Sequence, residues 1–445
     1  MRPTERLLRR LLASMIALCI CLPVAAVDDA HWKKADAAID KGITYLIGQQ
    51  AEDGSWMSEI GPAVTGLVLN GLINQPEIGP NHPAAAKAIR YILDRAQEDG
   101  SIRNGPDGIL ASYNTAICLS ALGPVMNDPE VAEVVRKGQD FLRGTQWIIG
   151  MTDPTGKVID KDHPFAGGFG YGKHGRPDIS NTQMALQAMH DTGVDCNDPT
   201  FQRALVFLNR LQATEGNDLF ADKFEELDGG FIYSTSVNKD AIGKPESKAN
   251  QDQIDEAKAG RAVSGLRTYG SVTYAGFKSL IYANLDRDDP RMLAAKSWIS
   301  KNYTLDQNPG MPEAQKLQGL FYYYITKARA LNAFGSTSIE VQGAATAKIT
   351  AAPEVAFSDV QAKMDELKAK GIVDIEVAQG EAGSGIVVAE TPGTVMRDWG
   401  NDLIATLVDQ QHEEGWWANT ETRWLESQPI LVTAYSVLAL QNAID

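Results

Sequence analysis

The stretch KGITYLIGQQAEDGSW, residues 41–56, sets the register for the rest of the chain. It holds a basic residue, a glycine, an aromatic-aliphatic pair, a glutamine and a Gly-x-Trp turn. Apolar residues at helical spacing with charges between them predict an amphipathic helix here. The aromatic-aliphatic pair Tyr45-Leu46 recurs in five further copies, at Tyr91-Ile92, Phe141-Leu142, Phe207-Leu208, Trp298-Ile299 and, more weakly, Thr406-Leu407.

A second set of positions marks another helix in each copy. A threonine is followed by small and apolar residues, beginning at Thr65, Thr115, Thr182, Thr273, Thr326 and Thr433. These segments are apolar nearly all round, which predicts buried helices. Each pair leaves an apolar face that only a neighbouring pair can cover, so six pairs predict a closed ring. An open solenoid is the alternative, but the first and last copies lack the polar face of capping repeats.

The first 26 residues predict a secretory signal peptide. Four arginines precede an apolar run over residues 11–22, and Val24 and Ala26 suit a signal-peptidase site. The run is too short to cross a bilayer comfortably, and an uncleaved anchor is the alternative. We therefore predict that residues 1–26 are removed and that the protein is exported, periplasmic or extracellular, with no transmembrane segment.

Charge and cysteine content exclude several classes of protein. The formal net charge is −16, and loss of the signal segment makes it more negative. Such a surface repels nucleic acid and anionic membrane, so we predict no nucleic-acid partner. Outside the signal segment only Cys118 and Cys196 remain, which cannot form a disulfide framework. Stability must therefore come from burial of apolar side chains.

Three connections are long. Residues 147–177 are rich in glycine, and residues 213–268 are polar with mixed charge. The third connection, residues 335–393, comes before the sixth pair. It has strand-like residues 338–341 and 373–377 around an amphipathic helix at 360–370, which predicts a small α+β insertion over residues 338–393. Long loops in a compact fold are usually functional or disordered.

The repeated turns point to a known family. The quoted stretch resembles the whole QW repeat of terpenoid cyclases, and residues 411–417 (QHEEGWW) resemble its second half. Residues 167–172 (GGFGYG) and 228–231 (DGGF) look like the corresponding turns of protein prenyltransferase β subunits. The chain thus resembles the prenyltransferase and squalene-oxidase repeat superfamily. The resemblance implies an all-α fold, an (α/α)6 toroid of six helix pairs over residues 30–442, with the small insertion before the last pair.

The resemblance also gives a place to look for an acid. Class II cyclases of this family protonate a polyene with an Asp-x-Asp-Asp-Thr motif, whose acid must stay protonated in an apolar cavity. Aligned on Thr182, this sequence keeps the first aspartate, Asp178. Ser180 and Asn181 replace the two carboxylates that follow, and neither is a strong acid. Asp178 is therefore the candidate catalytic residue, in a sequence that departs from the cyclase pattern.

Two other motifs are interpreted as structural. A literal Asp-x-Asp-Asp at residues 286–289 is followed by Pro290, as in Asn127-Asp128-Pro129, so we predict that it caps an outer helix. The zinc site of protein prenyltransferases needs Asp, Cys and His together. Neither Cys118 nor Cys196 has a histidine at ligand spacing, so we predict no metal site and no cofactor.

Residues just before each inner-helix threonine should face the central cavity of a toroid. They are apolar in copies one and six, whereas copies two to five carry Tyr, Ser, Asn and one Asp. This predicts a cavity with one polar, aromatic wall, suited to an apolar ligand with a polar end. The alternative is that these residues cap helices and bond to one another. The candidate binding residues are Tyr113, Asn114, His174, Arg176, Ser180, Asn181, Tyr269, Ser271, Tyr322 and Tyr324.

Two functions stay open at this point. One is an exported, cyclase- or prenyltransferase-like toroid whose cavity takes an isoprenoid or other apolar ligand. The other is a non-catalytic toroid that binds a lipid, a peptide or a partner protein. The replaced acid motif favours the second function, and the polar cavity wall favours the first.

Overall fold

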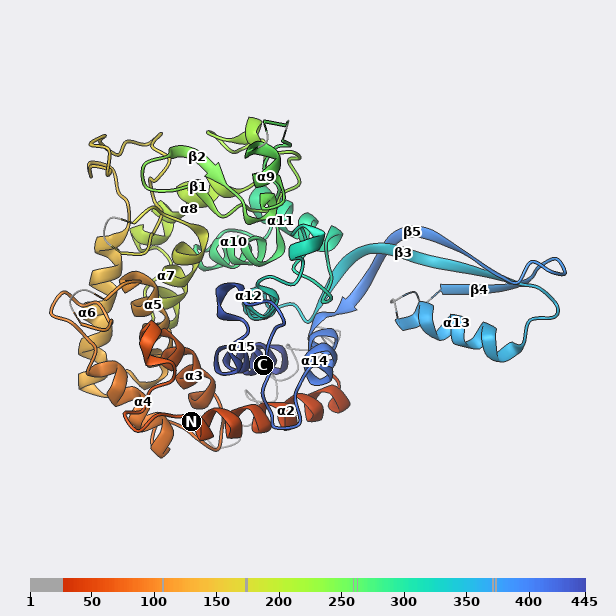
Figure 1. Ribbon diagram of the computed structural model, residues 1–445, viewed down its shortest axis with the longest axis horizontal. Coiled ribbons are helices and arrows are strands. Elements are labelled where there is room, and N and C mark those ends of the chain that lie inside the picture. The colour runs from red at the N-terminus through yellow and green to blue at the C-terminus, as the bar shows by residue number, and fades with distance from the viewer. Residues whose placement is uncertain are drawn as a thin grey trace, which may run out of the picture.

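The computed structural model describes residues 27–445, apart from 106–107, 173–174, 259, 262, 370–371 and 373. The predicted signal segment lies outside the described residues. Two rings of helices alternate along the chain (Figure 1). The outer helices are α2 (Asp29–Gly48), α4 (Pro83–Leu93), α6 (Pro129–Thr145), α8 (Pro199–Leu211), α11 (Pro290–Lys301) and α14 (Trp399–Asp409). The inner helices are α3 (Ala63–Ile73), α5 (Ala111–Leu122), α7 (Ile179–Asp191), α10 (Gly270–Tyr282), α12 (Leu320–Phe334) and α15 (Pro429–Ile444).

The ring is closed. Each inner helix packs on the next in chain order, and α15 packs back on α3 and on α2. The close approach at this seam explains Gly42 on α2, because a Cβ there would lie 2.8 Å from Val437 and 3.0 Å from Trp417. The predicted (α/α)6 toroid is confirmed, and the open solenoid is excluded. None of the helices in the described part of the chain is long and apolar enough to cross a membrane.

The outer helices begin as predicted, with a capping residue before proline. Asp128, Asp198 and Asp289 each accept a hydrogen bond from a backbone N–H of the first turn, and proline fills the first helical position. The literal Asp-x-Asp-Asp is therefore a cap: Asp289 begins α11 and pairs with Arg291, while Asp286 and Asp288 are exposed.

A glutamine ties each of four outer helices to the next. Its amide donates once to the glycine carbonyl of its own turn and once to a backbone carbonyl of the following outer helix. For Gln411 these acceptors are Gly415 at 3.0 Å and Ala38 at 2.9 Å, which links α14 to α2 across the seam. The four residues are Gln50, Gln146, Gln212 and Gln411.

The repeated threonine has a matching role at the inner helices. Its hydroxyl accepts a hydrogen bond from a backbone N–H of the turn that precedes the helix, as in Trp56 N to Thr65 Oγ1 at 3.0 Å. The same bond forms at Thr115, Thr182, Thr273 and Thr433. Five of the six repeats are therefore closed by a threonine on the inside, and four by a glutamine on the outside, whereas Thr326 of copy five donates to the Tyr322 carbonyl of its own helix.

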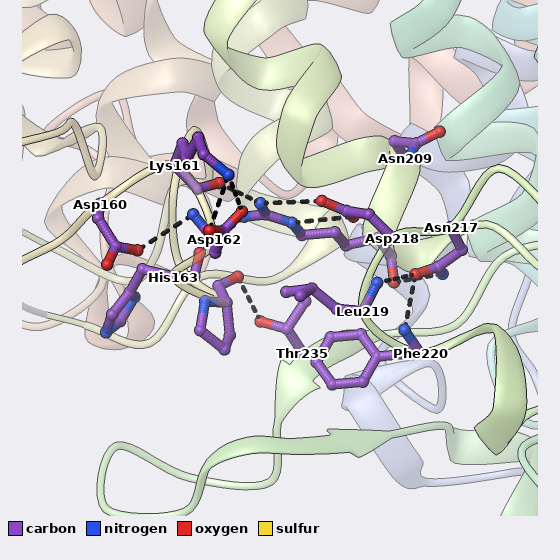
Figure 2. A network of polar contacts seen from close by, with 12 residues as sticks. Asp160, Lys161, Asp162, His163, Asn209, Asn217, Asp218, Leu219, Phe220 and Thr235 are labelled. Atoms are coloured by element: carbon purple, nitrogen blue, oxygen red, sulfur yellow. Dashed lines mark hydrogen bonds and ion pairs between the residues drawn. The ribbon is translucent and has the colours of Figure 1, made fainter.

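The two long loops are bound to each other through α8 (Figure 2). The buried Arg210 guanidinium donates to the carbonyl of His163 at 2.7 Å and to that of Lys161, and it pairs with Asp218. Thr235 Oγ1 donates to the Pro164 carbonyl at 3.0 Å. These bonds hold the two long loops together. The second long loop holds β1 (Ser234–Ser236), β2 (Ile242–Glu246), α9 (Gln253–Lys258) and the 3-10 turns Ala221–Lys223 and Lys248–Asn250. Other connections hold the 3-10 turns Ser58–Ile60, Gly123–Val125, Glu313–Gln315 and Arg423–Leu425.

An insertion projects from the ring between α12 and α14 (Figure 1). Two long strands, β3 (Ser338–Ala351) and β5 (Ile386–Asp398), form an antiparallel ribbon, and β4 (Asp374–Gln379) joins β3 in parallel. Helix α13 (Phe357–Ala369) packs on this sheet with a small core of its own. The predicted α+β character is confirmed, and the ribbon runs to the first residue before α14, beyond the predicted end at residue 393.

Candidate functional site

A cavity of about 450 Å³ opens among the first turns of the inner helices. One wall is apolar and comes mainly from α3 and the segment before α5, including Val64, Leu67 and Leu110. Tyrosines dominate the remaining wall. They come from α5, α12, α15, the residue before α10 and both long loops: Tyr113, Tyr171, Tyr233, Tyr269, Tyr322 and Tyr435. The two walls agree with the pattern before the inner-helix threonines.

Six of the predicted binding residues line this cavity. They are Tyr113, Asn114, Ser180, Tyr269, Ser271 and Tyr322. The Tyr322 hydroxyl lies 3.4 Å from Ser180 Oγ and accepts from Gln183 Nε2 at 3.0 Å. Tyr269 makes no side-chain hydrogen bond to any described residue, so its hydroxyl is available to a ligand.

Asp178 lies behind the cavity wall. It is the N-cap of α7, and its two carboxyl oxygens accept from the backbone N–H and the side-chain amide of Asn181, both at 2.9 Å. Burial raises its pKa to about 6, against the lowering effect of these two bonds. Neither Asp178 nor Asn181 is among the residues that line the cavity. The local bonds of Asp178 are those of a buried helix cap.

Two other predicted residues lie away from the cavity. Arg176 pairs with Glu246 at 2.9 Å and lies near the Tyr233 ring. Tyr324 donates its hydroxyl to the Leu305 carbonyl inside the ring wall. In copy five the inner helix begins six residues before its threonine, Thr326, which is earlier than in the other copies. Tyr322, and not Tyr324, therefore lines the cavity in this copy. His174 lies outside the described residues.

Loops supply further lining residues that no sequence pattern predicted. Tyr171 and Tyr233 come from the two long loops, and their hydroxyls lie 3.3 Å apart. Trp424 and Leu425 come from the turn before α15. Tyr171 lies in the glycine-rich turn that resembles a prenyltransferase motif, and this resemblance is the one sequence feature that could have indicated a role for it. The others have no periodic spacing to reveal them.

Glu426 is the missed residue with the strongest chemistry. It lines the cavity and is 0% exposed. Its Oε1 accepts from the backbone N–H of Tyr322 at 2.8 Å, and its Oε2 accepts from Asn419 Nδ2 at 2.6 Å. Burial raises the pKa of Glu426 to about 7, although these donors favour the charged form. The carboxyl group therefore titrates near neutral pH at the start of α12.

Backbone strain gathers at the rim of the cavity. Leu110, Trp424 and Leu425 have φ angles of 59°, 56° and 64°, in the left-handed region that side chains with a Cβ rarely adopt. All three line the cavity. Such strain persists only where surrounding structure enforces it, and it is common at ligand sites.

The remaining titratable groups give no metal site among the described residues, where no three His, Cys, Asp or Glu side chains gather. Cys118 is buried inside α5, and burial raises the pKa of its thiol. Cys196 is half-buried in the loop before α8.

Comparisons with known proteins concern the architecture. No family model and no curated protein matches the chain. Among solved structures, a type II terpene cyclase from Scytonema shares 12% identity over 93% of this chain and 98% of its own, with a TM-score of 0.46. An unsaturated glucuronyl hydrolase from Streptococcus agalactiae shares 10% identity over 95% of this chain and 96% of its own, with a TM-score of 0.48.

Proposed function

We propose that this toroid is an exported binding protein for an apolar small molecule of isoprenoid size, held in the central cavity. The cavity itself carries the proposal. Its volume, about 450 Å³, falls in the range of small-molecule pockets. Aliphatic and aromatic side chains supply most of its wall, and a few hydroxyls and two carboxyl groups, those of Glu59 and Glu426, supply polar groups that would orient a ligand. Residues 1–26 support export.

Ligand binding is expected to stabilise the fold. A neutral isoprenoid alcohol such as farnesol, at about 100 times its dissociation constant, should stabilise the protein by about 2.7 kcal/mol. Thermal unfolding with and without the alcohol measures this. Ala63→Trp should remove the effect by filling the cavity, since Ala63 lines it on α3. Ala86→Trp on the exposed face of α4 is the matched control. Unchanged melting of the wild-type protein, together with native mass spectra free of bound lipid, would contradict the proposal.

Cyclase-type catalysis is the second candidate, and Asp178 is the observation that favours it. A carboxyl group with a pKa near 6 is partly protonated at neutral pH. Against it stand the two bonds to Asn181 and the position behind the cavity wall. If Asp178 were the proton donor, Asp178→Asn would abolish cyclisation of a bound polyene. On the binding proposal the wild-type protein releases the polyene unchanged.

A further inference from the structure

Glu426 is a buried carboxyl group without a cationic partner. None of the ion pairs among the described residues includes it, and its hydrogen-bond donors are a backbone N–H and an asparagine amide. These donors orient the group as a cap for α12, but they carry no formal charge. Buried charges in proteins are normally paired, because an isolated charge costs several kcal/mol to bury. The site therefore lacks a positive charge.

No Lys or Arg is among the described residues that line the cavity. Arg176 and Lys248 both pair with Glu246 and lie over the ring of Tyr233. Arg423 donates to the Gln251 side chain at 2.6 Å. A ligand with a phosphate or carboxylate end would thus meet no cation among the lining residues, whereas two carboxyl groups, Glu59 and Glu426, line the cavity.

Two aromatic pairs in the wall remain free of cations. Tyr322 and Tyr435 have ring centroids 6.1 Å apart, and Tyr113 and Tyr171 also lie 6.1 Å apart. No Lys or Arg of the described residues lies over these four rings. Tyr322 is also the residue whose backbone N–H bonds to Glu426, so the carboxyl group and the first pair adjoin. Tyrosine faces attract ammonium groups within about 6 Å of the ring centroid.

We propose that the cavity selects a ligand whose polar end is an organic cation, a protonated amine or quaternary ammonium group held by Glu426 and the rings of Tyr322 and Tyr435. The inference rests on the proposed binding function and names its ligand class. The apolar wall would hold the hydrocarbon part. The net charge of −16 favours approach of a cation over that of an anion. Burial raises the pKa of Glu426, as expected for a carboxyl group with no positively charged neighbour to lower it.

Geranylamine and geraniol test this, because they share one carbon skeleton and differ in charge. By calorimetry at pH 8, the wild-type protein should bind the amine at least about tenfold more tightly than the alcohol. The preference should shrink towards pH 5.5, where Glu426 becomes protonated. Glu426→Gln keeps an acceptor for the Tyr322 N–H and should bind both compounds alike. Glu421→Gln, on the same loop but away from the cavity, should keep the preference.

Other outcomes separate the two proposals. If the alcohol binds as tightly as the amine, or if Glu426→Gln keeps the preference, the cation inference is overturned and the binding function stands. If the wild-type protein binds neither compound, both are overturned. Should Glu426→Gln fail to fold, Tyr435→Leu serves instead, because it removes one of the two rings. This variant should bind the amine about threefold or more weakly than the wild type and bind the alcohol with unchanged affinity.

Discussion

At the scale of single residues, the buried carboxyl groups differ in what their surroundings do. Asp153 is held well below its usual range, with a pKa of about 2, because donors from Thr155, Lys157 and His163 outweigh its burial. For Glu426 and Asp178 burial outweighs the donors, and their pKa values rise to about 7 and about 6. Asp153 bonds to His163 within the first long loop. Glu426 lines the cavity, and Asp178 lies behind the cavity wall.

The pKa of Glu426 predicts how stability depends on pH. A folded-state pKa raised from 4.5 to about 7 means that the folded protein holds a proton which the unfolded chain has lost. This group therefore contributes stability below pH 4.5, and the contribution is lost as pH rises to about 7. Each pKa unit corresponds to about 1.4 kcal/mol. Urea unfolding at pH 5 and pH 8 should show a smaller decrease for Glu426→Gln than for the wild type. The exposed Glu414→Gln should behave as wild type, and an unaltered decrease in Glu426→Gln would exclude this assignment.

At the scale of the repeat, the recurring residues hold neighbouring elements together. The glutamine, threonine and tryptophan side chains that recur in the repeats bond to backbone atoms. Trp56 and Trp417 donate to the carbonyls of Leu46 and Leu407, both at 2.7 Å. Copy five has Tyr303 in place of glutamine, and its hydroxyl reaches Asp402 on the next outer helix at 2.7 Å. The link between outer helices is thus kept where the residue that makes it has changed.

Removing one such link should cost measurable stability. Gln411→Leu removes the amide that donates to the carbonyls of Ala38 and Gly415 at the ring seam, and it leaves the Gly415 carbonyl without a side-chain donor. We expect the free energy of unfolding to fall by about 1–3 kcal/mol, the usual cost of unsatisfied polar groups. Gln410→Leu is the control, because exposed Gln410 makes only a 3.4 Å contact to Tyr324. Equal stability of the two variants in urea unfolding would show that the link contributes little.

At the scale of the whole molecule, ring and insertion should respond differently to deletion. The ring has one continuous core, whereas the insertion has a separate core on α13 and its sheet. Opening the ring exposes two large apolar faces that no polar cap covers. The ribbon can be shortened without opening the ring. Gln342 and Thr394 are partners in the antiparallel pair of β3 and β5, so a short turn can join them.

Two deletions compare these regions directly. Replacing residues 343–393 by Asn-Gly, a turn suited to a two-residue hairpin, should leave one cooperative transition and nearly the same melting temperature. Removing residues 27–80, with α2 and α3, should abolish cooperative unfolding, because α5 and α15 lose the helix that joins them. Circular dichroism during thermal unfolding measures both. A cooperative transition in the second variant would mean that the remaining pairs are stable as an open array.

The toroid, its six-fold register, the helix caps and the α+β character of the insertion could all be predicted from the sequence. They could be predicted because they depend on local periodicity and on residues such as Gln50 and Thr65, whose bonding partners lie at fixed places in each repeat. The sequence also located one wall of the cavity. Only the tertiary structure placed Tyr171, Tyr233 and Glu426 there and set Asp178 behind the wall. These placements depend on how long loops fold over the open end of the ring and on burial of single charged groups, and neither leaves a repeated pattern in the chain.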